Sequence, residues 1–382
     1  MKKRKIKKIL CVTNDLLFVH QHLYYILSYL SKSKGLEVFL ASSKKSLDNY
    51  KIPSKVKFVS IPITRKPHLI KDLNSIIKLT KIIRKEKPEL IISFTPKAGF
   101  ISLVVSKLFF SVINVHTFTG QVWANMKGIK AKFYRFIDSL IAVNSTLCLA
   151  DSESQAIFLN KKLYFSKKII GLKNGSLSGV DLERFKIEDI NLKSSLKFSK
   201  GIKYLYLGRL NIDKGINDLI QIVPKHLKTF KKDQFTFVGP CEDINILKNL
   251  NNIKEKWPKN IIINGFTNNP ESFLKNADIL LLPSRREGFS NTIIEAASCK
   301  VPTIAYDIYG IKNSLKNNVT GLLAKPFSIL DFSNLMKLCS NNTEIINKLS
   351  QKAYLYSRQF SHKKRTKVFI NTILKNISSI TF

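Results

Sequence analysis

Short runs of apolar residues alternate along the chain with longer segments in which apolar residues recur every three or four positions. The short runs predict buried strands and the longer segments predict helices that cover them. In the first half we expect strands at Lys8–Val12, Leu36–Ala41, Lys57–Ile61, Leu90–Phe94, Val112–His116 and Leu147–Ala150, and helices at Phe18–Leu30 and Leu69–Glu86. The alternation is typical of a parallel sheet with helices on its faces.

A second series of the same kind begins near Lys203. Its strands are expected at Lys203–Leu207, Gln234–Val238, Ile261–Asn264, Ile279–Leu282 and Pro302–Tyr306. Two successive series predict an α/β protein with two doubly wound, Rossmann-like domains. We expect an N-terminal domain over residues 1–175, a linker over 176–200, a C-terminal domain over 201–355, and a helical segment over 356–382 that packs back on the N-terminal domain.

The charge of the chain is strongly unbalanced. Its 382 residues include 64 Lys and Arg against 26 Asp and Glu, which gives a net charge of +38. Nucleic acid, an anionic membrane and a phosphorylated substrate are therefore all candidate partners. Residues 1–185 carry a net +22 and residues 186–382 a net +16, so the N-terminal half is expected to face an anionic surface. A codon bias toward Lys is an alternative source of much of this excess.

Cysteine usage and hydropathy indicate the compartment. The five cysteines stand far apart without a CxxC pair, which argues against a disulfide framework or a zinc site and fits a reducing cytosol. The basic N-terminus precedes only four apolar residues, Ile9–Val12, so we expect no export signal. The most apolar stretch, Phe100–Phe118, contains Lys107 and Asn114 and predicts a buried helix and a strand. We expect a cytoplasmic protein, peripheral at the inner face of the cell membrane.

The segment Pro283–Ala297 is the strongest candidate for a functional site. It follows an expected strand, has Gly288 where a tight turn is needed, and continues into a helix that begins near Asn291. The free N–H groups of such a helix start form an anion site. Glu287 precedes the helix and Glu295 lies about one turn into it. The alternative interpretation is that both are solvated glutamates on an amphipathic helix.

A Glu, seven residues and a second Glu at this place resemble the signature of retaining GT-B glycosyltransferases, particularly those of family 4. Cys299–Asp307 and Val319–Ala324 resemble the stretch that follows it in this family. The resemblance implies two Rossmann-like doubly wound domains that face a central cleft. It implies that Glu287 is catalytic and holds the transferred sugar, and that Glu295 holds the ribose of a nucleotide-sugar donor. The other donor contacts expected here are Gly288, Phe289, Ser290 and Asn291.

Upstream, Tyr206–Gly215 resembles the Gly-Arg…Lys-Gly element of the same family. Arg209 offers a planar fork and Lys214 a point charge at the carboxyl edge of an expected strand, where ligands of such sheets bind. We expect both side chains to bind the donor diphosphate. Asn264–Phe266 follows another strand and resembles loops that line the nucleobase pocket, so Phe266 is a further donor contact. A plain β-turn is the alternative for this segment.

In the N-terminal half, Val115–Trp123 resembles a loop of the family-4 enzymes that build O-antigen and capsular chains. The resemblance implies that His116, expected at the end of its strand, is catalytic and approaches the transferred sugar. A structural role is the usual alternative for a lone His. The chain departs from the family at Thr13–His22, where many members have a Gly-Gly turn. Asp15 and His20 are candidates for acceptor contacts there, against local capping and packing.

The resemblance implies transfer of a hexose or an N-acetylhexosamine from a UDP-linked sugar with retention, through an oxocarbenium-like centre. The chain has no Asp-x-Asp, so we expect no metal and no other cofactor. The leaving-group charge would be met by Arg209, Lys214 and helix N–H groups. The expected acceptor is a glycan on a polyprenyl diphosphate, in the synthesis of a bacterial surface polysaccharide such as O-antigen, capsule or lipopolysaccharide.

The arm Lys2–Lys8 and the aromatic, Lys-rich segment Trp123–Phe136 suit an anionic membrane surface, with solvated Lys faces as the alternative. Two rival functions are a UDP-sugar 2-epimerase on the same fold and a basic nucleic-acid-binding protein. The Gly-Arg…Lys-Gly and paired-Glu elements argue against the first. The second would need an Arg-rich groove-reading helix, an RNP-like aromatic motif or a zinc knuckle, and the sequence shows none, so no nucleic-acid partner is expected.

Overall fold

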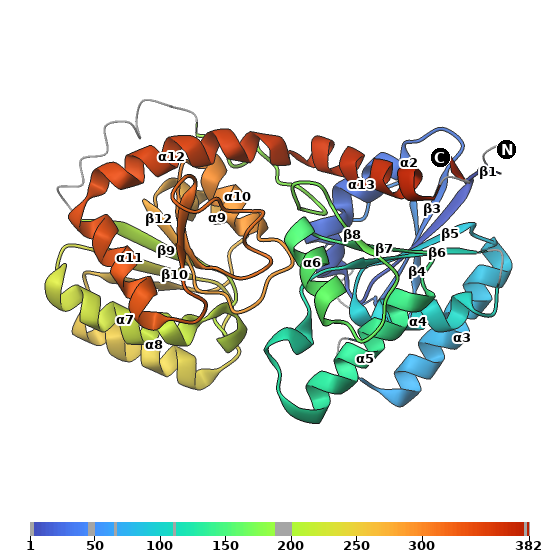
Figure 1. Ribbon diagram of the computed structural model, residues 1–382, viewed down its shortest axis with the longest axis horizontal. Helices are drawn as coiled ribbons and strands as arrows, with labels where there is room; N and C mark the ends of the chain where they lie inside the picture. The colour runs from blue at the N-terminus through green and yellow to red at the C-terminus, as the bar shows by residue number, and fades with distance from the viewer. Residues whose placement is uncertain are drawn as a thin grey trace. The chain divides into compact units, whose positions relative to one another are not determined.

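The computed structural model describes residues 4–44, 50–64, 67–109, 112–187, 201–377 and 380–381. The chain forms two compact units (Figure 1): unit 1 comprises Met1–Gly179 and His362–Phe382, and unit 2 comprises Val180–Ser361. Of the linker expected over 176–200, residues 176–179 thus lie in unit 1 and residues 180–187 in unit 2, because Val180, Leu182 and Phe185 pack into a hydrophobic core of unit 2. Residues 188–200 lie outside the described residues.

Unit 1 is built on a parallel seven-stranded sheet with the order β4-β3-β2-β5-β6-β7-β8. Its strands are β2 (Lys8–Val12), β3 (Glu37–Ser42), β4 (Val56–Ser60), β5 (Leu90–Ser93), β6 (Ile113–Phe118), β7 (Leu147–Ala150) and β8 (Ile169–Gly171). Its helices are α1 (Leu16–Phe18), the π-helical turn η1 (Val19–Leu23), α2 (Tyr24–Ser31), α3 (Leu69–Glu86), α4 (Pro96–Ser106), the 3-10 turn η3 (Val122–Asn125), α5 (Gly128–Asn144), α6 (Glu153–Lys162) and α13 (His362–Asn376). A short pair, β1 (Arg4–Lys5) with β15 (Ile380–Thr381), joins the two ends of the chain.

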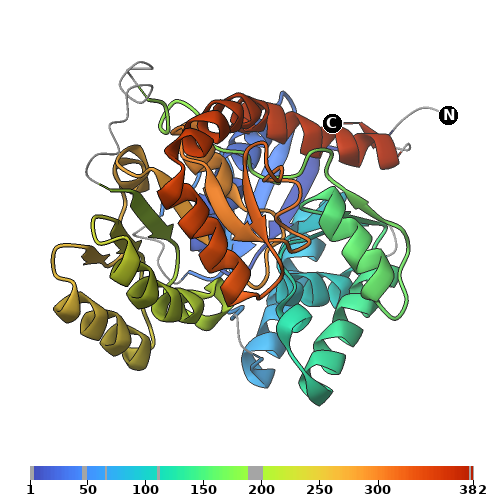
Figure 2. The ribbon, with the colours of Figure 1, turned by 60° about the vertical axis from the view of Figure 1, so that its left-hand side comes forward.

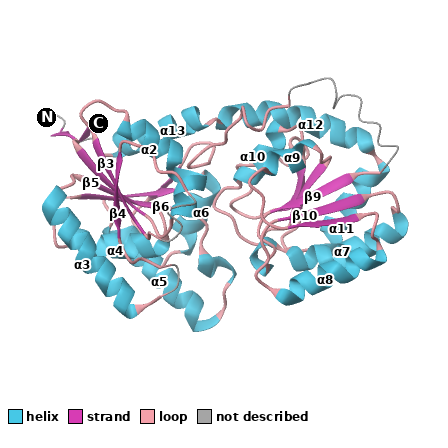
Figure 3. Ribbon diagram, turned by 180° about the vertical axis from the view of Figure 1, so that it is seen from behind, coloured by secondary structure: helices cyan, strands magenta, loops and turns pink. Residues whose placement is uncertain are grey.

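Unit 2 is built on a parallel six-stranded sheet with the order β11-β10-β9-β12-β13-β14. Its strands are β9 (Lys203–Leu207), β10 (Gln234–Val238), β11 (Ile261–Asn264), β12 (Ile279–Leu282), β13 (Thr303–Tyr306) and β14 (Gly321–Ala324). Its helices are the 3-10 turn η5 (Ile212–Lys214), α7 (Ile216–Thr229), α8 (Ile244–Lys256), α9 (Pro270–Lys275), α10 (Asn291–Ser298), α11 (Ile329–Asn341), α12 (Thr343–Ser357) and the 3-10 turn η6 (Arg358–Phe360). Helices cover both faces of each sheet (Figure 3). The two doubly wound α/β units predicted from the sequence are confirmed.

Local chemistry explains where the elements begin and end. The side chain of His68 accepts a hydrogen bond from Lys71 N at the start of α3, and the helix stops at Lys87, which adopts a left-handed conformation before Pro88. The helix expected at Phe18–Leu30 is interrupted by the π-helical turn η1. The apolar stretch Phe100–Phe118 is divided between α4 and β6, and every described helix is too short or too polar to span a bilayer.

Each sheet has one position at which the strand order reverses. In unit 1 this switch point lies between β2 and β5, and in unit 2 it lies between β9 and β12. The chain continues from the two central strands to opposite faces of the sheet, which opens a crevice outside their carboxyl ends. Ligand sites of doubly wound proteins occur at such positions, so the loops after these four strands are the places to look for function.

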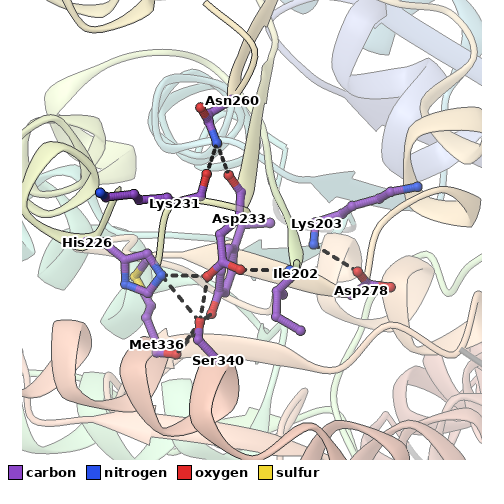
Figure 4. A network of polar contacts seen from close by, with 10 residues as sticks. Ile202, Lys203, His226, Lys231, Asp233, Asn260, Asp278, Met336 and Ser340 are labelled. Carbon is purple, nitrogen blue, oxygen red and sulfur yellow. Dashed lines mark hydrogen bonds and ion pairs between the residues drawn. The ribbon is translucent and has the colours of Figure 1, made fainter. Parts of the chain in front are cut away.

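The opposite, amino edge of the unit 2 sheet is closed by buried hydrogen bonds (Figure 4). Asp233 accepts hydrogen bonds from Ile202 N at 2.8 Å and from Ser340 Oγ at 2.7 Å, and its carboxylate lies 2.8 Å from His226 Nε2. Asp278 accepts from Lys203 N at 2.8 Å. His226 and Asp233 are buried. This Ser-His-Asp group therefore fixes the start of β9, and its imidazole and carboxylate are closed to a substrate.

The helix α13 completes the core of unit 1. Its apolar side chains Phe369, Ile370 and Ile373 pack into the same core as β2 and α2. Buried Arg365 donates hydrogen bonds to the carbonyls of Ser176 at 3.1 Å and Lys173 at 2.7 Å. The segment expected to return to the N-terminal domain from residue 356 enters unit 1 at residue 362, because Tyr356 and Phe360 still pack in unit 2.

Candidate active site

The loops that follow β9 and β12 are in direct contact at the unit 2 switch point. Gly215 ends η5 with φ of 73°, and a Cβ at this position would overlap the carbonyl of Pro283. Arg285 N donates a hydrogen bond of 2.9 Å to Asp213 O. A Cβ at Gly310 would likewise overlap the carbonyl of Glu287. Both glycines therefore allow a close backbone approach that any larger residue would prevent.

This contact brings Lys214 and Glu287, both predicted from the sequence, together as an ion pair. Lys214 Nζ lies 2.5 Å from Glu287 Oε1. The side chains are 25% and 11% exposed respectively, so both keep a small accessible surface. The carboxylate and the ammonium thus share one partly buried position at the switch point, where a charged ligand would meet both of them.

Two further ion pairs tie the loop after β12 to the loop after β9 and to the first turn of α7. Arg286 Nη2 lies 2.7 Å from Asp213 Oδ2, and Arg285 Nη2 lies 2.7 Å from Asp218 Oδ1. Asp218 also accepts a hydrogen bond of 2.8 Å from the Tyr306 hydroxyl. Sequence reasoning missed these pairs. The charged residues are visible beside Lys214 and Glu287, but the partners come from segments about seventy residues apart, and the sequence alone does not pair them.

Arg209 remains available to a ligand. Arg209 is exposed, and its guanidinium makes no hydrogen bond or ion pair with any described residue. It borders a cavity of about 540 Å³ that lies between residues 209–213 on one side and the segments at Pro240 and Glu242–Ile246 on the other. A fixed fork of five donors without a protein partner is suited to phosphate oxygens.

Phe266 lies one strand further along the same edge. Gly239 N, after β10, donates hydrogen bonds of 3.1 Å to the carbonyls of Asn264 and Gly265. Phe266 follows directly, with 61% of its surface exposed. The structure assigns no β-turn here, since Asn264 ends β11 and Gly265 and Phe266 continue as irregular chain. The exposed ring offers a flat apolar surface to a ligand.

The start of α10 follows the ion pairs directly. Its N-cap residue Ser290 makes no side-chain capping hydrogen bond, and Gly288 and Ser290 are buried while Asn291 is partly exposed. The side chain of Phe289 packs against Phe360 in a hydrophobic core. Phe289 can therefore meet a donor only through its backbone.

Glu295 lies within α10 and is partly exposed. Its carboxylate has no hydrogen-bond or ion-pair partner in the part of the chain that the structure describes. The pKa of Glu295 is raised to about 7, mainly by burial; Arg184 opposes this shift and Glu271 adds to it. Once this carboxyl group is ionised, it can accept hydrogen bonds from a diol.

His116 does not lie where the sequence placed it. The expectation that it ends a strand is wrong, because β6 continues to Phe118. The imidazole is 1% exposed, accepts or donates a hydrogen bond of 2.8 Å with Ser93 Oγ, and leaves Nε2 buried without a partner among the described residues. Burial lowers the pKa of His116 to about 3. In this position a neutral ring supports the packing of α4, where a Cβ at Gly99 would collide with it.

The acceptor-side candidates lie after β2, at the unit 1 switch point. Asp15 caps α1, where its carboxylate accepts a hydrogen bond of 2.8 Å from Phe18 N. His20 is exposed in η1, with its ring 5.4 Å from that of Tyr50. Asn14 Oδ1 accepts a hydrogen bond of 2.7 Å from Thr95 Oγ1, which joins the loops after β2 and β5. Within the described ranges, no three His, Cys, Asp or Glu side chains are grouped as a metal site would require.

Comparisons with known proteins agree with this architecture. The family model described as glycosyl transferases group 1 matches residues 188–368, and the one described as glycosyl transferase 4-like matches residues 8–144. The crystal structure of Anabaena HepE in complex with UDP has a TM-score of 0.74 at 17% identity and covers 96% of this chain and 100% of that one. Two Rossmann-like units of this kind define the GT-B class of glycosyltransferases.

Two relatives have similar length. The capsular polysaccharide biosynthesis glycosyltransferase CapM of Staphylococcus aureus is 26% identical over 329 residues, which cover 85% of this chain and 84% of that protein. The Escherichia coli UDP-Gal:alpha-D-GlcNAc-diphosphoundecaprenol alpha-1,3-galactosyltransferase is 27% identical over 317 residues, 80% of each chain. With both halves matched, the chain belongs to the family-4 glycosyltransferases of GT-B fold, and it is an enzyme of this class.

Proposed function

We propose that this glycosyltransferase moves a hexose or an N-acetylhexosamine from a UDP-linked donor to a glycan carried on a polyprenyl diphosphate. Transfer proceeds with retention and needs no metal ion or other cofactor. The product belongs to a bacterial surface polysaccharide made at the cytoplasmic face of the membrane. The relatives named for capsule synthesis and for a diphosphoundecaprenol-linked acceptor support this choice of pathway and acceptor.

The observation that carries the proposal is the Lys214–Glu287 ion pair, with Arg209, unpaired among the described residues, in the same segment after β9 as Lys214. A diphosphate between Arg209 and Lys214 would have its charge balanced as the leaving group departs. The ammonium of Lys214 has three donors, so it can hold Glu287 and a phosphate oxygen at the same time. Glu287 is then fixed beside the sugar attached to that phosphate, where its free oxygen accepts hydrogen bonds from sugar hydroxyls.

The remaining donor contacts follow the edge of the unit 2 sheet. Glu295 accepts the ribose hydroxyls, Phe266 packs against the base, and the backbone N–H groups of 288–291 face the diphosphate. When the bond between the anomeric carbon and the diphosphate oxygen breaks, positive charge develops at that carbon. An acceptor hydroxyl attacks the same face and forms the new glycosidic bond, its proton passes to the departing diphosphate oxygen, and the configuration is retained.

The deciding experiment replaces Glu287 by Gln, which keeps the volume but removes the charge. Transfer of sugar from a UDP-sugar panel to a polyprenyl-diphosphate acceptor is measured together with UDP release and the UDP dissociation constant. We expect kcat to fall about 10²–10³-fold, the size found when one group that stabilises a transition state is removed, with little change in UDP affinity. Glu255→Gln, at an exposed position of α8, is the matched control.

Undiminished transfer in Glu287→Gln, with native circular dichroism, would refute the catalytic role. Conversion of the UDP-sugar without any acceptor would favour a 2-epimerase instead. Proton NMR of the product tests retention, and activity that survives EDTA unchanged is expected if the charge is met by Arg209 and Lys214 rather than by a metal ion.

A further inference from the structure

The N-terminal half of α5 carries an exposed apolar stripe. Ile129, Phe133 and Phe136 are 84%, 56% and 44% exposed, and their spacing of four and three residues places them on one face of the helix. The opposite face, with Asp138, Ile141 and Ala142, is buried against unit 1. We call the three exposed residues the α5 stripe. The ring of Phe165, 40% exposed and 5.8 Å from that of Phe136, extends it.

The N-terminal half of α3 carries a second stripe. Leu69, Ile70, Leu73 and Ile77 are between 45% and 90% exposed and follow helical spacing, whereas the buried residues Leu79 and Ile83 belong to the other half of the helix. We call the four exposed residues the α3 stripe. Their apolar period predicts a core-facing helix from the sequence, but in the structure the packed face of this end carries Asp72 and Ser75, and the side chains of the α3 stripe are exposed.

Both stripes belong to the same edge of unit 1. In a parallel sheet with crossover helices, each helix starts where the preceding strand ends, so the N-terminal halves of α3 and α5 lie toward the carboxyl edge of the sheet. Figures 1 and 2 show these two ends projecting from the same side of unit 1. The loops after β2 and β5 lie at this edge too.

The charges around the stripes are positive. Lys71, Lys78 and Lys81 on α3 and Lys130 and Lys132 on α5 are exposed. The acidic residue near the start of α3, Asp72, is paired with Lys97 at 2.8 Å, and the acidic residue of α5, Asp138, is buried and accepts a hydrogen bond from Trp123. Helix ends that carry apolar side chains between lysines match an anionic lipid interface. The apolar side chains enter the acyl boundary, and the lysines meet the lipid phosphates.

We propose that the α3 and α5 stripes dock unit 1 on an anionic lipid bilayer. The docking itself does not depend on the proposed reaction. One consequence of the docking rests on the proposed function. If the acceptor is lipid-linked, the docked protein would receive it at the sheet edge that holds the loops after β2 and β5. The sequence predicted that Trp123–Phe136 faces the membrane. Trp123 is excluded from this surface because it is buried against Phe158. Lys2 and Lys3 of the expected basic arm lie outside the described residues.

The test is sedimentation of the full chain with vesicles of phosphatidylcholine, with and without 30% phosphatidylglycerol. We expect at least tenfold more bound protein on the anionic vesicles and a loss of this binding in 0.5 M salt. The variants Ile129→Ser/Phe133→Ser/Phe136→Ser and Leu69→Ser/Leu73→Ser/Ile77→Ser are each expected to lose at least tenfold in binding, and Lys130→Gln/Lys132→Gln about threefold.

The matched control is Leu330→Ser/Leu355→Ser, which removes two equally exposed apolar side chains from unit 2 and should bind vesicles like the wild type. Circular dichroism and the UDP dissociation constant, which involves unit 2, verify that each variant is folded. Wild-type binding that is absent, or that both stripe variants retain, would overturn the proposal. A dimer in light scattering that becomes a monomer in the stripe variants, without vesicle binding, would assign the stripes to a second copy of the chain.

Discussion

The two switch points have the same topology but different chemistry. In unit 2, the loop after β12 is joined by two ion pairs to the loop after β9 and by a third to the first turn of α7, and Arg209 remains unpaired among the described residues. In unit 1, the loops after β2 and β5 are joined by the neutral hydrogen bond between Thr95 and Asn14, and the acidic residue there, Asp15, turns back to cap α1.

This difference indicates how one fold can serve two kinds of ligand. A crevice with surplus cations suits a diphosphate, whose charge must be balanced. A crevice with neutral amide and hydroxyl groups suits a carbohydrate, whose hydroxyls need donors and acceptors but no net charge. We therefore expect changes at the unit 2 crevice to affect nucleotide binding and changes at the unit 1 crevice to leave it unaltered.

The largest effect on UDP affinity is expected from Lys214→Met. The variant removes the ammonium that would hold a phosphate and leaves Glu287 without its partner. A hydrogen bond to a charged group contributes about 1.5–3 kcal/mol, so UDP affinity should weaken roughly 10–100-fold by calorimetry, and kcat/KM should fall at least as far. Lys228→Met, on the exposed side of α7, is the control. Unchanged UDP affinity would mean that this crevice does not bind the diphosphate.

A smaller effect is expected from pH through Glu295. Because its pKa is raised to about 7, the carboxyl group is mostly neutral at pH 6 and ionised at pH 8. The affinity for UDP-glucose, a probe whose diphosphate does not titrate in this range, should increase up to about tenfold between these values. Glu295→Gln should remove the dependence. A wild-type affinity that stays flat across this window would exclude a ribose contact by this carboxylate.

The same raised pKa has a consequence for stability. The unfolded chain releases the Glu295 proton near its ordinary pKa of 4.5, whereas the folded chain holds the proton until about pH 7. Folding therefore loses free energy as the pH rises through this window. Glu295→Gln should raise the melting temperature at pH 8 relative to the wild type and leave it unchanged at pH 4.

The smallest effect is expected from Thr95→Ala in unit 1. Loss of the buried hydrogen bond to Asn14 should lower the free energy of unfolding by about 1 kcal/mol, measured by urea denaturation, and should leave UDP affinity unchanged. Thr95→Ser, which keeps the hydroxyl, is the control. A UDP affinity that falls in Thr95→Ala alone would contradict the division of labour between the two crevices.

Most of the fold could be predicted from the sequence, since buried parallel strands are short apolar runs. The bounds expected for β2, β7, β9, β10, β11 and β12 agree with the structure residue for residue. The strands β8 and β14 were missed, because Ile169–Gly171 is too short to show a pattern and Gly321–Ala324 was interpreted only as a family motif. His116 was misplaced because Thr117 and Phe118, which continue β6, precede a Gly and were taken as the start of a loop.

Candidate site residues could be named from the sequence, but their contacts could not. Glu287, Lys214 and Arg209 could be named from motifs, yet the pairing of Lys214 with Glu287 depends on the adjacency of β9 and β12, which the order of the chain does not display. The exposure of the α3 stripe could not be predicted from the sequence either. A helical apolar period indicates that a face is covered by something, without indicating whether the cover is the protein's own sheet.

The position of α13 has a consequence for the synthesis of the protein. A ribosome completes the strands of unit 1 first, but the buried cluster around Phe369 and the hydrogen bonds of Arg365 to the chain at 173–176 become available only after all of unit 2 has been translated. Unit 2, contiguous between Val180 and Ser361, can fold as soon as it emerges. The N-terminal unit is thus the last to reach its native state, and a premature stop near residue 360 would damage the beginning of the protein rather than its end.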